Sequence, residues 1–251
     1  MKKIKPIVKC QGNKNNLSSW IIEHFPEDYR DLTYCELFAG TASVFFQKEP
    51  SIEEVLNDID EGLVQIIRAI RDEPKEFINR TRRTKYTERA FKMALNRQEK
   101  GYEDYVENAV NEYILRRMSR GESKVKFANA NDQNGWKSTL DQVHSMSNRL
   151  GEKTVVTNHD FFDVFKKWDE EETLFYVDPP EMPDSRMNKK LKDNELSTEQ
   201  HVTLLEMIKN ARGKVVISHS ECPIYKTNLK GWKCKKTNVS NKYMECIWFN
   251  Y

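Results

Sequence analysis

From residue 33 onward, short apolar runs alternate with segments in which apolar residues recur at helical spacing. This alternation is typical of α/β proteins with a mostly parallel sheet, because each parallel strand needs a crossover, usually a helix, before the next strand. Candidate strands occur at residues 33–38, 54–57, 153–157, 174–177, 214–218, 232–239 and 244–250. Since only a short turn separates the last two, we expect a terminal antiparallel hairpin on a seven-stranded, mostly parallel sheet.

Helices are expected at four places around these strands. The segments 18–24, 63–70 and 198–210 carry apolar residues at helical spacing, and the segment 41–47 opens just after a glycine. The run Ser197-Thr198-Glu199-Gln200 supplies an N-cap for the last of these helices.

The middle of the chain, residues 79–149, breaks this rhythm. An apolar helical stripe at residues 105–114 precedes a basic stretch, RRMSRGESKVKF, and a polar one, ANANDQNGW. Residues 79–126 hold thirteen Lys and Arg against seven Asp and Glu, a local charge of +6 in a chain whose formal net charge is +2. We therefore expect a catalytic domain formed by residues 1–78 and 150–251, with an inserted, mainly helical lobe at 79–149. The basic charge fits contact with a polyanion, but a solvated helical face explains it nearly as well.

Several other classes of protein do not fit this sequence. No apolar run approaches membrane-spanning length, and the basic N-terminus lacks the continuous apolar core of a signal peptide. The five cysteines include no CxxC pair, and together with the five histidines they show no metal-ligand spacing. We expect a cytoplasmic protein with reduced thiols, no bound metal and no membrane segment.

Two features point to a cofactor that contains a nucleoside. The chain turns at Gly40, directly after the first strand, where a glycine lets the backbone approach a ligand closely. Asp58 follows the second strand, eighteen residues after Gly40, near the spacing at which an acid holds both hydroxyls of a ribose. A packing turn and a helix N-cap are the structural alternatives. The full GxGxxG fingerprint is absent, which argues against a nicotinamide dehydrogenase.

A third feature is NHDFFDVF, at residues 158–165. Asp160 and Phe161 follow a strand, at a position where an acid beside an aromatic ring could bond to and stack on adenine. In isolation, the better explanation is core packing of the phenylalanines, with Asp160 as a helix cap.

The fourth feature is YVDPPE, at residues 176–181. Asp178 followed by Pro179 and Pro180 gives a carboxylate and carbonyl groups held rigidly at the end of a buried strand. Such acceptors suit an exocyclic amine, whose lone pair is delocalised into the aromatic ring. Gripping the amine hydrogens localises that lone pair and stabilises the charge that develops during transfer. A proline-rich turn with a capping Asp is the structural alternative.

In kind and in order, these motifs resemble those of the Dam-like (D12 class) DNA N6-adenine methyltransferases. QGNKNN is similar to their N-terminal cofactor segment, ELFAGTAS to their cofactor motif and NDID to their ribose-binding acid. RRMSRGESKVKFA is similar to the segment that closes their target-recognition insert, HDFFDV to their adenine-contacting motif and YVDPPE to their catalytic DPPY. The resemblance implies a Rossmann-like fold that depends on S-adenosyl-L-methionine, and double-stranded DNA as the partner.

The resemblance also implies roles for individual residues. The catalytic group is Asp178, Pro179, Pro180 and Glu181. The cofactor contacts are Cys10, Lys14, Phe38, Gly40, Asp58, Ile59, Asp160, Phe161 and Asp178. From the basic residues themselves, we expect DNA backbone contacts at Arg116, Arg117, Arg120, Lys124 and Lys126, with Arg120 and Lys124 the best candidates for base contact, and Arg186 on a phosphate. Burial of Arg116 or Arg117 in support of the lobe, and an ordinary solvated loop around Arg186, remain alternatives.

Two aromatic positions of the family are missing. Glu181 stands where relatives have the Tyr that stacks on the flipped base, and Cys10 stands where they have Trp or Tyr. A base–aromatic stack is worth about 1–3 kcal/mol. Glu181 could point to solvent while Tyr176 or Phe162 supplies the stack, it could accept a proton or bind the amine of a different base, or the site could be impaired.

The expected activity is methyl transfer to adenine N6 in a short duplex site, by a monomer or weak dimer. A catalytically silent relative that binds DNA and cofactor, and an RNA methyltransferase, are the alternatives.

Overall fold

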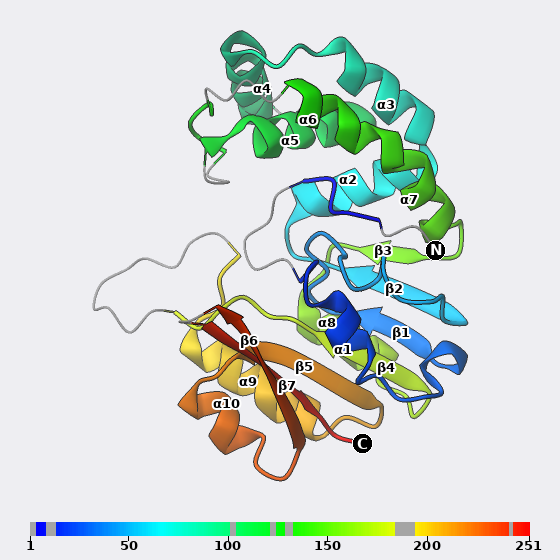
Figure 1. Ribbon diagram of the computed structural model, residues 1–251, viewed down its shortest axis with the longest axis vertical. Helices are drawn as coiled ribbons and strands as arrows, with labels where there is room; N and C mark the ends of the chain where they lie inside the picture. Colours follow the sequence, from blue (N-terminus) through cyan, green and yellow to red (C-terminus); the bar gives the residue numbers. More distant parts are fainter. Residues whose placement is uncertain are drawn as a thin grey trace. The chain divides into compact units, whose positions relative to one another are not determined.

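The computed structural model describes residues 4–8, 14–100, 104–120, 124–128, 133–183, 194–240 and 243–251 (Figure 1). The chain divides into two compact units. The helical unit comprises Met1–Ser18, Gly40–Lys48 and Asp60–Val156, and the sheet unit comprises Ser19–Ala39, Glu49–Ile59 and Thr157–Tyr251. The predicted lobe, residues 79–149, falls within the helical unit, and its boundaries stay a prediction. Among the described helices, none combines the length and apolar character that a membrane span requires.

The described part of the chain forms one seven-stranded sheet in the order β3-β2-β1-β4-β5-β7-β6 (Figure 1). The strands are β1 (Thr33–Glu36), β2 (Glu53–Asn57), β3 (Val155–Thr157), β4 (Thr173–Val177), β5 (Lys214–Ser220), β6 (Lys233–Ser240) and β7 (Tyr243–Phe249). Parallel pairs join β2 to β1, β1 to β4 and β4 to β5, whereas β7 is antiparallel to both β5 and β6. All seven predicted strands and the terminal hairpin are confirmed, with ends that differ by a few residues.

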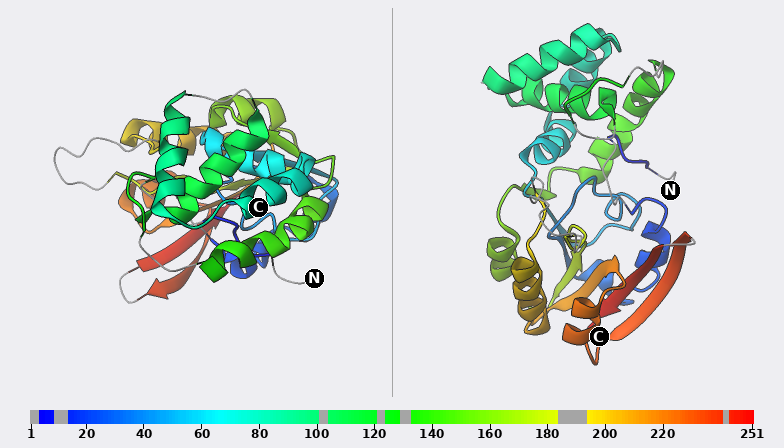
Figure 2. Two further views of the ribbon diagram at one scale, coloured as in Figure 1. Left: turned by 90° about the horizontal axis from the view of Figure 1, so that it is seen from above. Right: turned by 90° about the vertical axis from the view of Figure 1, so that its left-hand side faces the viewer.

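The central strands are apolar because both faces of the sheet unit are covered. Every residue of β4 is buried, and its β-branched and aromatic side chains suit a strand in that setting. Successive side chains point to opposite faces. Tyr176 contacts Phe25, which follows α1 (Ser18–Ile22), and its neighbour Phe175 contacts Phe165 of α8 (Phe161–Trp168). Figure 2 shows α1 on one side of the sheet and α8, α9 (Thr198–Lys209) and α10 (Pro223–Asn228) on the other.

Helix α9 begins as the sequence predicts. The Ser197 hydroxyl accepts a hydrogen bond from the Gln200 backbone N–H at 3.2 Å, and the Gln200 side chain accepts one from the Ser197 N–H at 2.8 Å. Two backbone donors that the helix leaves without partners are thereby satisfied.

Residues 41–47 do not form the helix that the sequence predicts. Gly40 and Ala42 both have a positive φ, 52° and 53°, which an α-helix cannot accommodate. The segment forms turns, in which the Val44 carbonyl accepts from the backbone N–H groups of both Gln47 and Lys48 at 3.0 Å. The expected helix N-terminus just after Gly40 is therefore wrong, and a ligand near Gly40 would meet turn backbone.

The helical unit is built around α5 (Tyr105–Met118), which packs against α2 (Glu61–Asp72), α3 (Pro74–Arg83) and α4 (Glu88–Lys100). Its remaining described helices are α6 (Gln133–Ser138), the short 3-10 helix Thr139–Gln142 and α7 (Val143–Leu150). Tyr113 of α5 is fully buried, with its ring 4.8 Å from that of Trp136. Apart from the exposed Tyr105, the apolar residues of the stripe predicted at residues 105–114 are buried and belong to the core-forming side of α5.

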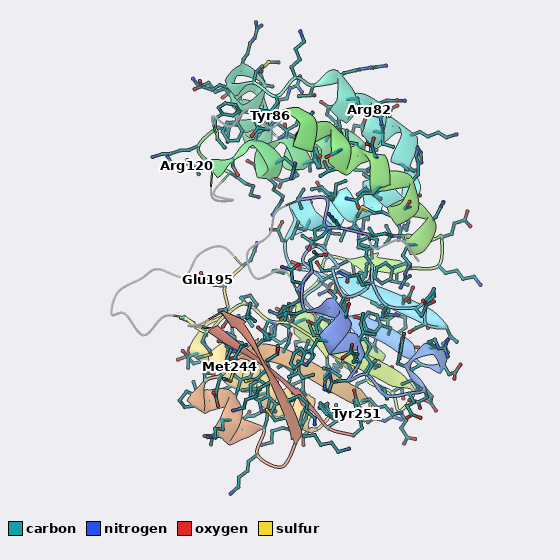
Figure 3. All side chains as sticks on the ribbon, viewed as in Figure 1. Arg82, Tyr86, Arg120, Glu195, Met244 and Tyr251 are labelled. Atoms are coloured by element: carbon teal, nitrogen blue, oxygen red, sulfur yellow. The ribbon has the colours of Figure 1, made fainter. Side chains whose placement is uncertain are left out.

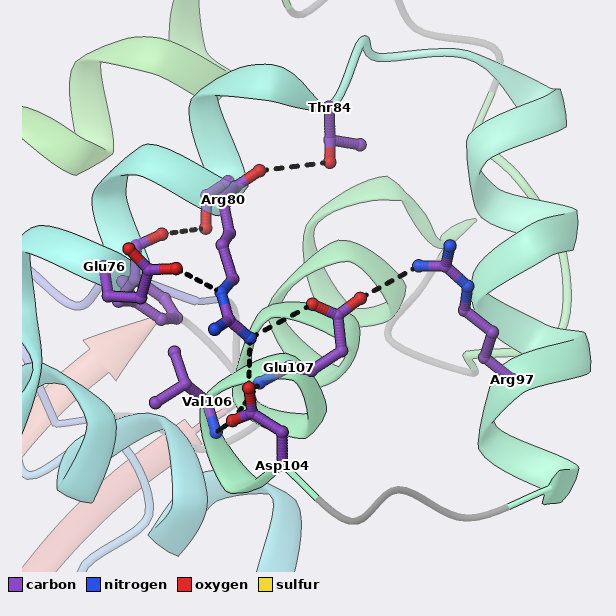
Figure 4. A network of polar contacts seen from close by, with 9 residues as sticks. Glu76, Arg80, Thr84, Arg97, Asp104, Val106 and Glu107 are labelled. Carbon is purple, nitrogen blue, oxygen red and sulfur yellow. Dashed lines mark hydrogen bonds and ion pairs between the residues drawn. The ribbon is translucent and has the colours of Figure 1, made fainter.

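A network of ion pairs connects α3, α4 and the start of α5 (Figure 4). Arg80 binds Glu76 at 2.6 Å and Asp104 at 2.5 Å, and it lies 3.4 Å from Glu107, which Arg97 also binds at 3.0 Å. The hydrogen bond to Glu76, followed by that to Asp104, raises the pKa of Arg80, and the bond from Arg80 lowers the pKa of Asp104. Part of the basic charge predicted for contact with a polyanion is therefore used to hold helices of this unit together.

Candidate active site

Three predicted site residues meet at one edge of the sheet. Because β2, β1 and β4 are neighbours and parallel, their carboxyl ends lie side by side. Phe38 follows β1, Asp58 follows β2 and Asp178 follows β4. Ligand sites of open α/β sheets form outside this edge.

Asp178 is held by a chain of two hydroxyl groups. The Ser218 hydroxyl, on neighbouring strand β5, donates to Asp178 Oδ1 at 2.9 Å, and the Tyr176 hydroxyl lies 3.0 Å from the same serine oxygen. A serine has one hydroxyl proton, so Ser218 donates to Asp178 and accepts from Tyr176. The hydroxyl groups of Ser218 and Tyr176, which belong to the buried sheet, therefore fix the orientation of the carboxylate. Asp178 itself is half-buried.

Tyr176 is not the aromatic that could stack on a base. It is buried, and its ring packs against Phe25 within the sheet unit. Burial, with a further contribution from the charge of Asp178, raises the pKa of Tyr176 well above its usual value, so that its hydroxyl stays a donor. Phe162, the other residue predicted for this role, has 46% of its surface exposed.

Glu181 lies over the end of β5. It is exposed, yet its Oε2 accepts a hydrogen bond from the Ser220 hydroxyl and lies 3.5 Å from Nε2 of the buried His219. Glu181 therefore has partners in the fold and does not simply extend into solvent. Pro179 before it is buried, and Pro180 is half-buried.

Asp58 is positioned by the polar residues around it. Its N–H donates to the Thr157 carbonyl at 3.3 Å, and the Asn158 side chain donates to the carbonyls of Asp58 and Ile59 at 2.8 and 3.0 Å. The helix cap that the sequence offered as an alternative role for Asp58 belongs instead to Asp60, which accepts from the Leu63 N–H. Asp58 is half-buried and the Ile59 side chain is exposed.

Asn57, which sequence reasoning missed, ties three segments together at this edge. Its buried side-chain amide donates to the carbonyls of Leu37 and His159, at 3.1 and 3.0 Å. Its oxygen accepts from the Thr157 hydroxyl at 2.9 Å and from the His159 N–H at 3.0 Å. Its place at the end of a strand, just before Asp58, was the signal that could have identified it. Ser218 was missed in the same way, as a polar residue ending an apolar strand.

An aromatic pair completes this edge of the sheet unit. The rings of Phe38 and Phe161 lie 5.2 Å apart. The exposed Asp160 caps α8 by accepting from the Phe162 N–H at 2.8 Å, so the structural explanation offered for Asp160 is correct. A cofactor role for Asp160 stays a prediction.

Two predicted cofactor residues belong to the helical unit. Lys14 is buried there, and Gly40 forms the positive-φ turn described above. Cys10 and Arg186 lie outside the described residues.

Arg116 is not placed to contact DNA as predicted. Its guanidinium is buried and donates to both carboxylate oxygens of Asp60 at 2.7 Å and to Glu112 at 3.2 Å. Lys124 also binds Glu112, at 3.2 Å. The charge of Arg116 is thus used inside the helical unit, which agrees with the alternative of a supporting role.

The other basic residues predicted for DNA contact lie at the end of α5 and after it. Ser119 and Phe127 form an antiparallel bridge, and the Arg120 N–H donates to the Lys126 carbonyl at 2.8 Å. Arg120 and Lys126 are exposed, and Arg117 is half-buried. Figure 3 shows the Arg120 side chain extending outward from the ribbon.

The family model for D12 class N6 adenine-specific DNA methyltransferase matches residues 11–243, which include every motif discussed above. No curated protein matches the chain in a sequence search. Among solved structures, two of the rRNA methyltransferase aviRa from Streptomyces viridochromogenes are 9% identical, with TM-scores of 0.42 and 0.45, and they cover 97% of this chain and 88% and 89% of their own. The Escherichia coli protein yhhF is also 9% identical, with a TM-score of 0.42 and coverages of 97% and 89%. Similarities this distant carry no argument, whereas the family model spans nearly the whole sequence. The chain belongs to the family of D12 class N6 adenine-specific DNA methyltransferases.

Proposed function

We propose that this chain transfers a methyl group from S-adenosyl-L-methionine to N6 of an adenine in duplex DNA, with Asp178 as the residue that holds the amine. The observation that carries the proposal is the position of Asp178, at the carboxyl end of β4, fixed by Ser218 and followed by a diproline. A carboxylate offers about four acceptor positions, so it can accept from an amine hydrogen as well as from Ser218.

The residues at the sheet edge fit the proposed cofactor. The aromatic pair of Phe38 and Phe161 suits an adenine ring, and Asp58 suits the two hydroxyls of a ribose. Bound S-adenosyl-L-methionine would present a methyl group that its sulfonium already makes electrophilic. The protein therefore has to orient the amine and exclude water, and it needs no residue to activate the methyl group.

Asp178 and the carbonyl of Pro179 would accept hydrogen bonds from the two N6 hydrogens, which localises the nitrogen lone pair. As the nitrogen becomes positively charged, the carboxylate of Asp178 would stabilise it and take the proton that the amine loses. Because duplex DNA encloses the amine, the adenine has to be flipped out of the stack before it reaches this carboxylate.

We further propose that Arg120 and Lys126 contact the DNA, and that the protein acts in the cytoplasm as a monomer or weak dimer. Cys35, Cys222, Cys234 and Cys246 are free thiols in the described structure, which supports a reducing compartment.

The test is to incubate the protein with duplex DNA and methyl-labelled S-adenosyl-L-methionine, and then to digest the DNA to nucleosides. Label in N6-methyl-2′-deoxyadenosine is expected, and its loss in Asp178→Ala is the control. Label confined to N4-methyl-2′-deoxycytidine would contradict the adenine assignment. DNA and cofactor binding without transfer would identify a catalytically silent relative.

A further inference from the structure

The ring of His219 lies at the end of β5 and has a backbone partner on each nitrogen. Nδ1 lies 2.8 Å from the carbonyl oxygen of Ser220, and Nε2 lies 3.2 Å from the backbone nitrogen of Met182. The first contact is within β5. The second connects β5 to the segment that follows Asp178, Pro179 and Pro180.

These two partners determine the protonation of the ring. A carbonyl oxygen can only accept, so Nδ1 carries a proton; a backbone N–H can only donate, so Nε2 carries a lone pair. His219 is therefore neutral, in the form with the proton on Nδ1.

Glu181 is held beside this ring by a different group. Its Oε2 accepts from the Ser220 hydroxyl and lies 3.5 Å from His219 Nε2, which is an acceptor in the neutral ring. Protonation of Nε2 would make that nitrogen a donor to Glu181 and would remove the acceptor that Met182 uses. The two arrangements exclude each other.

We propose that neutral His219 is a positioning residue for the catalytic segment, the chain that follows Asp178. His219 holds Met182 while Ser220 holds Glu181, and together these two contacts fix the segment. This inference rests on the proposed function, since it gives Glu181 and His219 a role in the same site. The carboxylate of Glu181 thereby anchors the segment at the position where the family's aromatic residue stacks on the base.

The groups around the ring are mostly uncharged. The Tyr225 ring of α10 stacks on it at 4.0 Å, and His201 of α9 approaches its edge at 5.7 Å, with His201 Nδ1 2.8 Å from the Tyr225 hydroxyl. Burial, with a further contribution from His219, lowers the pKa of His201 to about 4, and burial raises the pKa of Tyr225. Both are therefore neutral near pH 7.

The cysteines on this side are neutral as well. Cys246 of β7 stands opposite His219, and burial raises its pKa to about 12; burial also raises the pKa of Cys222, at the start of α10. Lys236 of β6, which stands opposite Cys246, is paired with Glu221 at 2.5 Å. Among the described residues, Glu181 is a charged group close to the imidazole, with its Oε2 3.5 Å from Nε2. A protonated Nε2 would therefore donate to Glu181.

Falling pH protonates His219, breaks the bond from Met182 and releases the catalytic segment, so methyl transfer declines. The variant His219→Gln places a neutral acceptor near the position of Nε2 and cannot take up a proton. The variant His219→Asn reaches only the position of Nδ1 and offers Met182 no acceptor.

The experiment compares kcat against pH for the wild-type protein and both variants, with thermal unfolding as the control for folding. His219→Gln is expected to retain kcat within a few-fold at neutral pH. Its kcat should not show the decline at low pH that protonation of His219 produces in the wild-type protein. His219→Asn is expected to lose about 10- to 100-fold in kcat, the cost of a misplaced catalytic group, with KM for S-adenosyl-L-methionine little changed. Wild-type activity and an unchanged pH profile in His219→Asn would overturn the proposal.

A second measurement needs neither a variant nor activity. Nitrogen NMR of the wild-type protein is expected to show His219 with Nδ1 protonated, and the Met182 amide is expected to exchange with deuterium faster as the ring is protonated. A ring protonated on Nε2 at neutral pH would overturn the proposal. A wild-type protein that transfers no methyl group would refute the proposed function alone, because these two readouts would still report on the ring.

Discussion

The Ser218 hydroxyl donates a 2.9 Å hydrogen bond to Oδ1 of Asp178 and thereby couples the carboxylate that we propose to be catalytic to the buried centre of the sheet. Ser218 can do this because β5 pairs with β4 in parallel, so that the end of one strand lies beside the end of the other. Its own oxygen accepts from Tyr176, whose raised pKa keeps that hydroxyl protonated. The orientation of Asp178 is therefore set by residues that need not touch the substrate.

Replacing Ser218 by Ala is expected to lower kcat by about tenfold, since a lost hydrogen bond to a charged group is worth about 1.5–3 kcal/mol. KM for both substrates should change little, because the carboxylate remains. Tyr176→Phe is the matched comparison, since it removes the donor to Ser218 but leaves the bond to Asp178; its effect should be smaller. Steady-state kinetics on a duplex oligonucleotide measures both. Undiminished kcat in Ser218→Ala would show that Asp178 is held by other means.

Arg116→Met is expected to destabilise the helical unit by about 3 kcal/mol, because it removes the shared partner of the half-buried Asp60 and the buried Glu112, which keeps only Lys124 as a cationic partner among the described residues. Arg82→Met is the matched control. Arg82 pairs with Asp141 at the surface, where 54% of its side chain is exposed, and such pairs contribute about 1 kcal/mol or less. Urea unfolding measures the free energy of unfolding of both variants. Equal decreases in that free energy would contradict the assigned role of Arg116.

The stability that comes from Asp60 should depend on pH. Burial alone would raise its pKa, but the charge and hydrogen bonds of Arg116, with smaller contributions from the charge of Lys124 and the Leu63 N–H, together lower it. Its contribution is therefore present above the unfolded pKa of about 3.9 and is lost as pH falls through the lower folded value. The stability difference between wild type and Asp60→Asn should be constant near neutral pH and shrink below about pH 4. Denaturant unfolding from pH 7 to pH 3 measures it. A difference that grows on acidification would show that Asp60 is not stabilised as a charged group.

The sequence predicted the sheet well and the side-chain partnerships poorly, for physical reasons. Strands such as β4 are continuous apolar runs, and their burial follows from that alone. The segment 41–47 was expected to be a helix because it opens just after a glycine, but a positive φ at Ala42 is a backbone choice that the sequence pattern does not encode. Arg116 looked like a DNA contact because its carboxylate partner Asp60 is far away in sequence. The motifs located Asp178, whereas Ser218 became visible only once the strand order was known.

Arg120→Gln and Lys126→Gln are expected to weaken duplex binding across sequences and each to reduce the slope of log K against log salt by about one. Both side chains are exposed beside the antiparallel bridge after α5. Arg97→Gln is the matched control, because that exposed arginine is paired with Glu107. Binding titrations at several salt concentrations check the slopes. If a variant with both substitutions keeps the wild-type slope of log K against log salt, the DNA contact lies elsewhere.

Phe162→Ala is expected to weaken substrate binding without unfolding the protein. Helix α8 turns Phe161, Val164 and Phe165 into the core, whereas 46% of Phe162 is exposed near the carboxyl end of β3. A stack on a flipped base is worth about 1–3 kcal/mol, so its loss should raise KM for DNA by roughly tenfold or more. Val239→Ala, on the terminal hairpin and similarly exposed, is the control and should have no effect. The Phe162 ring could stack on the DNA base or on the cofactor, and equilibrium binding of S-adenosyl-L-homocysteine distinguishes the two. Unchanged affinity for S-adenosyl-L-homocysteine assigns Phe162 to the base, whereas an affinity that falls together with DNA binding assigns it to the cofactor. If neither the KM for DNA nor the affinity for S-adenosyl-L-homocysteine changes, Phe162 does not replace the tyrosine that the family has at the position of Glu181.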